Sequence, residues 1–101
     1  MTSIMEKSEL SGAELFSTLA DCFISIGYPA RYRIVEYCQN PKRFSDIVLD
    51  LRLNPASFKF HSKVLMDCTL LERVERGVYQ TTELGKLLLQ LGEKARNITK
   101  A

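Results

Sequence analysis

The stretch that decides the fold is residues 54–68, which read NPASFKFHSKVLMDC. Asn54 followed by Pro55 is typical of a helix start, because asparagine is a favoured N-cap and proline suits the first helical position. We therefore expect a helix from Pro55 to roughly Cys68. Helical spacing places positions 56, 59, 60 and 63 on one face and positions 58, 61, 62 and 65 on the next. One helix thus presents two faces of different chemistry.

The apolar face of this helix is expected to pack on a core through Phe58, Leu65 and Cys68. The other face leaves four side chains available to a partner: Ala56, Lys59, Phe60 and Lys63. Lysine can reach phosphate or guanine, and phenylalanine can contact a thymine methyl group in a DNA major groove. A solvated basic face would explain the lysines equally well, and a core or interface role would explain Phe60.

A shorter helix is expected just before residue 54. Ser45 is a good N-cap for a helix from Asp46 to about Leu51, and only about three residues then separate the two helices, as in a helix-turn-helix. Further upstream, Pro29 marks the start of a helix that ends before Asn40-Pro41. Its apolar face is predicted to comprise Ala30, Ile34, Val35 and Cys38, with Arg31 and Arg33 turned elsewhere.

Short β-type segments follow the 55–68 helix. Residues 70–75 and 78–81 predict a small hairpin, with the turn at Arg76-Gly77, where glycine supplies a positive φ. Thr82 is expected to cap a last helix. The order of elements therefore predicts a mainly α fold with a small β-hairpin.

The chain ends carry more apolar surface than one small domain easily covers. Residues 12–26 have the period of a wide-faced buried helix, preceded by a flexible segment over residues 1–10. The chain is expected to be one domain over residues 1–101, dimerising through the helices within 11–26 and 82–99. The predicted interface residues are Leu15, Phe16, Leu19, Phe23, Leu84, Leu87, Leu88 and Leu91. A homodimer would also place two DNA-reading helices one turn, ~34 Å, apart, although both terminal helices could instead pack on their own monomer.

Several of these segments resemble the winged helix-turn-helix transcriptional regulators of bacteria and archaea, nearest the ArsR-like and MarR-like branches. Residues 27–35 are similar to that family's Gly-x-Pro-x-Arg-x-x-Ile-Leu helix opening, and residues 43–47 also resemble the family segment. Residues 79–85 look like the Tyr-x-Leu-Thr-x-x-Gly segment that leaves the wing. The strongest match is to the recognition-helix pattern Thr-x-Ser-x-His-x-Lys-x-Leu, at Ser57, Lys59, His61, Lys63 and Leu65.

The sequence departs from the family pattern at positions that bear on the branch to which it is compared, and not on the fold. Thr69 stands where a glycine usually ends the recognition helix, and Ser62 stands where a leucine usually packs. The metal-sensing members carry cysteine pairs on the recognition helix, or histidine and acidic ligands on the last helix, and this sequence has neither. The resemblance therefore implies no metal and no cofactor. His61 is expected to be a packed residue whose ring nitrogen meets a backbone or solvent partner.

The charge distribution agrees with DNA as the partner. Net charge is only +2, but residues 31–63 carry +4 and the remainder −2. Beyond the 55–68 helix, Arg43 and Ser45 form a plausible phosphate site, Ser57 can donate near the helix start, and Arg73 and Arg76 flank the tip of the 72–80 wing. A structural N-cap at Ser45 and a purely structural hairpin are the competing interpretations.

The sequence argues against several other classes. It has no glycine-rich phosphate loop and no carboxylate or histidine constellation, so an enzyme is not expected. Cys22, Cys38 and Cys68 predict buried thiols rather than a disulfide scaffold, with redox pairing as the alternative. No transmembrane span or signal peptide is evident, so we expect a cytoplasmic protein without membrane contact.

The function predicted from the sequence is that of a homodimeric regulator that reads double-stranded DNA. The alternative is a winged-helix module that binds protein in a transcription or repair assembly.

Overall fold

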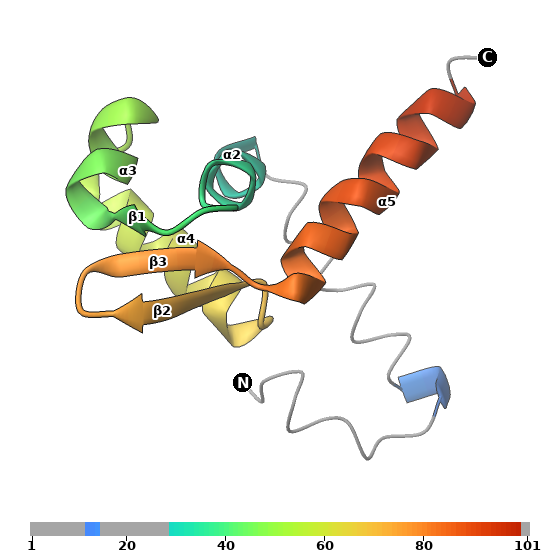
Figure 1. Cartoon of the computed structure of the whole chain (residues 1–101), viewed down its shortest axis with the longest axis horizontal. Helices are drawn as coiled ribbons and strands as arrows, with labels where there is room; N and C mark the ends of the chain where they lie inside the picture. Colours follow the sequence, from blue (N-terminus) through green and yellow to red (C-terminus); the bar gives the residue numbers. More distant parts are fainter. Residues whose placement is uncertain (1–11, 15–28, 100–101) are drawn as a thin grey trace.

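The computed structural model describes residues 12–14 and 29–99 (Figure 1). The described part is mainly helical with one small antiparallel sheet, as predicted. Its elements are α2 (Pro29–Tyr37), β1 (Lys42–Arg43), α3 (Phe44–Asp50), α4 (Pro55–Asp67), β2 (Leu71–Glu75), β3 (Val78–Thr81) and α5 (Glu83–Thr99). Residues 12–14 are helical, and the rest of the helix expected over 12–26 lies outside the described residues, as does the segment 1–10.

The sheet has three strands, in the order β1-β3-β2, with β3 in the centre. The predicted hairpin of β2 and β3 is confirmed, and a bulge interrupts its register between Arg73 and Glu75. The additional strand β1 pairs antiparallel with β3, so that Lys42 lies opposite Tyr79 and Arg43 lies opposite Val78. This short strand brings the segment before α3 alongside the hairpin.

The helix ends are set by local hydrogen bonds. The predicted N-cap of α4 is confirmed, because Asn54 Oδ1 accepts a hydrogen bond from the Ala56 amide at 2.8 Å. The predicted cap of α5 is also confirmed, since Thr82 Oγ1 accepts from the Gly85 amide at 3.1 Å. The prediction for α3 was wrong: the helix begins at Phe44, and the N-cap is Arg43, whose side chain makes no capping hydrogen bond. Pairing in β1 fixes Arg43 in extended conformation, and Ser45 is carried inside the helix.

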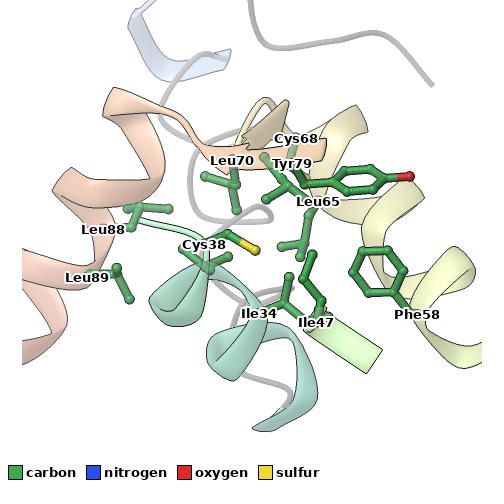
Figure 2. Packing of buried hydrophobic residues seen from close by; sticks show 12 residues of the cluster. Ile34, Cys38, Ile47, Phe58, Leu65, Cys68, Leu70, Tyr79, Leu88 and Leu89 are labelled. Carbon is green, nitrogen blue, oxygen red and sulfur yellow. The ribbon is translucent and has the colours of Figure 1, made fainter. Parts of the chain in front are cut away.

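The core gathers side chains from the helices α2 to α5 and from the strands β2 and β3 (Figure 2). Phe58 and Leu65 extend from α4 toward α2 and the sheet, and both are fully buried, as predicted for this face of α4. The remaining buried apolar residues are Ile34, Val35 and Cys38 of α2, Ile47 of α3, Cys68, Leu70, Leu71, Tyr79, and Leu88 and Leu89 of α5. Burying one face of α4 in this way leaves its other face to solvent.

Thr81 joins the end of β3 to the end of α2. Its hydroxyl donates to the Val35 carbonyl oxygen at 2.6 Å, and its amide donates to the Cys38 carbonyl oxygen at 2.8 Å. Both acceptors lie near the C-terminal end of a helix, where carbonyl groups lack partners within the helix. The buried threonine therefore closes α2 and anchors the sheet to it.

The hairpin turn supports a prediction about two glycines. Gly77 has a φ of +75°, and a Cβ added to it would meet nothing within 4 Å, so Gly77→Ala would act through the backbone alone. We expect this change to lower the free energy of unfolding by roughly 1–2 kcal/mol, the cost of a left-handed conformation. Gly92→Ala in α5 is the matched control, also in open space, and should instead raise stability by about 1 kcal/mol. Urea denaturation measures both, and equal effects of the two changes would contradict this account.

Candidate nucleic-acid interface

The solvent-facing side of α4 carries the residues predicted to read DNA. Ala56, Lys59, Phe60 and Lys63 are all exposed, as is Ser57 near the helix start. Phe60 is 60% exposed, whereas Phe58, two residues earlier on the same helix, is fully buried. We call Ala56, Lys59, Phe60 and Lys63 the α4 face. It offers two cations and one flat apolar ring on a rigid helix.

The position of α4 is fixed by aromatic packing behind this face. The ring of Phe58 meets Phe44 edge to face, at 5.4 Å between centroids, and meets Tyr79 in the same manner at 5.2 Å. These contacts tie α4 both to the start of α3 and to β3. The α4 face is therefore held in a defined orientation relative to the hairpin.

A second group of predicted residues meets in one surface groove. Arg43 and Ser45, at the start of α3, line it together with Arg76 at the hairpin turn. The groove has a volume of about 560 Å³, and its other lining residues are Phe44, Glu75, Gly77 and Val78. Its two sides are linked by a backbone hydrogen bond of 2.8 Å, in which the Phe44 amide donates to the Gly77 carbonyl oxygen. We call this the α3–hairpin groove. Its two guanidinium groups suit an anion, and Glu75 reduces the positive charge.

Arg73 does not line this groove. Its guanidinium carbon lies 5.5 Å from the centroid of the Tyr79 ring, and Nη2 donates a long hydrogen bond to the Tyr79 hydroxyl at 3.4 Å. These contacts hold the arginine against the sheet. Its neighbours Glu72 and Glu75 are exposed acidic residues on the same strand. Of the two hairpin arginines predicted to contact DNA, Arg76 is therefore the one placed beside Arg43 and Ser45.

The predicted orientation of Arg31 on α2 is wrong. It was expected to turn away from the core, but it is only 7% exposed. Its Nε donates a hydrogen bond of 3.1 Å to Nδ1 of His61 on α4. His61 is thus packed, as predicted, but this ring nitrogen meets a side chain rather than backbone or solvent. Burial, followed by the positive charge of Arg31, lowers the pKa of His61 from its ordinary value of 6.5. The helical spacing of Arg31 with Ile34, Val35 and Cys38 was the signal that could have revealed its burial.

The predicted interface residues of α5 have different surroundings. Leu87 and Leu91 are 48% and 46% exposed, Leu84 is partly buried, and Leu88 is buried in the core of its own chain. Figure 1 shows α5 running away from the sheet toward the C-terminus. The predicted residues Leu15, Phe16, Leu19 and Phe23 lie outside the described residues.

The structure describes two of the three cysteines. Cys38 and Cys68 are both buried, as predicted, and Cys22 lies outside the described residues. Burial raises the pKa of Cys38 to about 12, against a smaller opposing effect of Lys42. The Cys38 thiol is therefore protonated at neutral pH, which makes it a poor nucleophile. Within residues 12–14 and 29–99, no cluster of three or more histidine, cysteine or carboxylate side chains is arranged to hold a metal ion.

Neither comparison with known proteins assigns the chain to a family. No model of a known protein family matches the sequence, and no curated protein matches it significantly. Among the helices that the structure describes, none combines the length and the apolar character needed to cross a bilayer.

Proposed function

We propose that the protein is a winged helix-turn-helix regulator of transcription that binds double-stranded DNA. The observation that carries this proposal is the pair of surfaces formed by the α4 face and the α3–hairpin groove. The first presents Lys59, Phe60 and Lys63 on one side of a helix, and the second gathers Arg43 and Arg76. An α-helix fits the major groove, where lysine and phenylalanine contact phosphates and base edges.

The connection between the helices supports the same proposal. Helix α3 ends at Asp50 and α4 begins at Pro55, a spacing suited to a helix-turn-helix. In this arrangement α4 is the recognition helix and the β2–β3 hairpin is the wing. The three-stranded sheet and the bond from Phe44 to Gly77 hold the hairpin turn beside the start of α3. Arg43, Ser45 and Arg76 would then contact the sugar-phosphate backbone of the DNA, on one side of the major groove that α4 reads.

A homodimer is part of this proposal. The half-exposed Leu87 and Leu91 lie one turn apart on α5, with Ile98 further along, 75% exposed. A second copy of the chain would cover these residues by a symmetric contact and would bring a second α4 for the other half of a DNA site. The region 11–26, also predicted to dimerise, is mostly outside the described residues.

The test is binding of the whole chain to a fluorescent duplex of mixed sequence, followed by anisotropy across a salt series. We expect measurable affinity at low salt, with log affinity falling linearly as log salt rises, because binding releases condensed counterions. Competition with unlabelled duplexes of different sequence then measures selectivity. Absence of binding at low salt would contradict the proposal and would favour a module that binds protein.

A further inference from the structure

One contact between α2 and α4 lies directly behind the α4 face. Arg31, almost fully buried, donates from Nε to His61 Nδ1 across 3.1 Å, joining residues 30 positions apart in the chain. A ring nitrogen accepts a hydrogen bond only when it carries no proton. The contact therefore requires neutral His61 with its hydrogen on Nε2.

The same arginine also contacts Phe60. Its guanidinium carbon lies 5.6 Å from the centroid of the Phe60 ring, within the range of a cation–π interaction. The His61 ring meets that phenylalanine ring edge to face, with 5.5 Å between the centroids. Arg31 thus touches two successive side chains of α4, and one of them lies on the α4 face between Lys59 and Lys63. The exposed Phe60 ring is therefore contacted by Arg31 from the side of α2.

We propose that Arg31 is a positioning residue for the α4 face, and that protonation of His61 breaks its contact and weakens DNA binding. This inference rests on the proposed function. Arg31 acts through Phe60 and His61, and restraining those side chains before binding lowers the entropy cost of ordering them on DNA. The proposal therefore links a nearly buried residue of α2 to the affinity of a surface on α4.

Protonation removes the contact for two reasons. A protonated Nδ1 becomes a donor, so it cannot accept from Arg31, and the imidazolium places a second positive charge beside the guanidinium. The elements that contact α4 include α2 and β2, and also α3 and β3 through the rings of Phe44 and Tyr79. Their charged residues are Arg31, Arg33 and Glu36 on α2, Asp46 and Asp50 on α3, and Glu72, Arg73 and Glu75 on β2. Burial and, after it, the positive charge of Arg31 both oppose protonation of His61 and lower its pKa.

The sign of the pH dependence separates this proposal from simple electrostatics. A positive charge added to a DNA-binding helix would by itself strengthen attraction to phosphate as the pH falls. Loss of the Arg31 contact would instead weaken binding. We expect the second effect to dominate, because the α4 face loses the restraint on Phe60 whenever His61 carries a proton. Affinity should therefore decrease on acidification below the ordinary histidine pKa of 6.5.

The experiment measures the Kd of the whole chain for the same duplex from pH 7.5 to pH 5.5 at constant ionic strength. The wild type should lose affinity roughly three- to tenfold on acidification, the range expected for one hydrogen bond. His61→Gln keeps an acceptor and does not titrate, so its Kd should not vary with pH in this window. Arg31→Met keeps apolar packing but lacks the donor, so it should bind more weakly at pH 7.5 and should lose no further affinity on acidification.

Arg31→Lys tests the geometry of the contact. It retains a positive charge but lacks the planar fork of arginine, so it should behave like Arg31→Met if the Nε–Nδ1 bond matters. Circular dichroism checks that each variant is folded. Two results would overturn the proposal. One is an affinity of the wild type that rises on acidification. The other is a Kd of His61→Gln that varies with pH in the same way as that of the wild type.

A second readout does not depend on DNA. The chain has one histidine, so a single imidazole signal in an NMR titration reports on His61. Its pKa should lie below 6.5 in the wild type and rise toward that value in Arg31→Met. If the wild type binds no DNA, the proposed function fails whatever this titration shows. If His61 titrates identically in both proteins, the coupling between Arg31 and His61 is wrong even where DNA binds.

Discussion

The double variant Lys59→Ala/Lys63→Ala should lose most of the affinity for duplex DNA. Each lysine that meets a phosphate contributes about 0.9 to the slope of log affinity against log salt, so two contacts contribute roughly 1.8. At about 0.1 M salt this corresponds to a loss of roughly 60-fold. Both side chains are exposed on the α4 face, so their removal leaves the core unchanged. Fluorescence anisotropy across a salt series measures the affinity and the slope together.

The matched control for this variant is Lys86→Ala/Lys94→Ala on α5. It removes the same charge from the protein, but from a helix that lines a different groove, between α2 and α5. We expect its salt slope to stay close to that of the wild type. Equal losses in the two double variants would show that net charge, rather than the α4 face, determines binding. Full affinity in Lys59→Ala/Lys63→Ala would show that DNA binds to another surface of the protein.

The second large effect concerns stability. Phe58→Ala should lower the free energy of unfolding by about 3–5 kcal/mol, the range for removing a large aromatic side chain from a core. Phe58 is fully buried and contacts the rings of Phe44 and Tyr79 at 5.4 and 5.2 Å. Its loss therefore opens a cavity where α3, α4 and the sheet meet. Urea denaturation monitored by circular dichroism measures the change.

Phe60→Ala provides the control for Phe58→Ala. It is the same substitution two residues further along the same helix, but Phe60 is 60% exposed. We expect a loss below about 1 kcal/mol, limited to the contacts with Arg31 and His61 and the small area that Phe60 covers. Similar losses of stability in the two variants would contradict the structure, in which Phe58 lies on the buried face of α4 and Phe60 on the exposed face. The difference between them isolates the effect of burial.

Local sequence signals were sufficient to predict most of the elements. Asn54 and Pro55 fixed the start of α4 because an N-cap and a first-turn proline act through nearest neighbours alone. Gly77 marked the hairpin turn for a similar reason, since its positive φ is a property of one residue. The exposed residues Lys59 and Lys63 followed from helical spacing. Each of these inferences needed only a few residues of context.

The features that the sequence did not reveal depend on distant partners. Arg31 was expected at the surface because an arginine is rarely buried without a partner, and its partner His61 follows 30 residues later. Strand β1 was missed because two basic residues give no β pattern, and they pair only once β3 has been placed beside them. The N-cap of α3 is Arg43 rather than the predicted Ser45 as a consequence of the same pairing. Contacts between distant residues thus determine these three features, which local sequence preferences do not specify.

Among the described strands, β2 forms one edge of the sheet, and one side of its backbone pairs with none of them. Such an edge can recruit a strand from another molecule and start aggregation. Here four of the five residues are exposed, three of them are charged, and the bulge between Arg73 and Glu75 distorts the register that an incoming strand would need. The acidic residues that reduce the positive charge of the hairpin therefore also disfavour pairing of this edge with another strand.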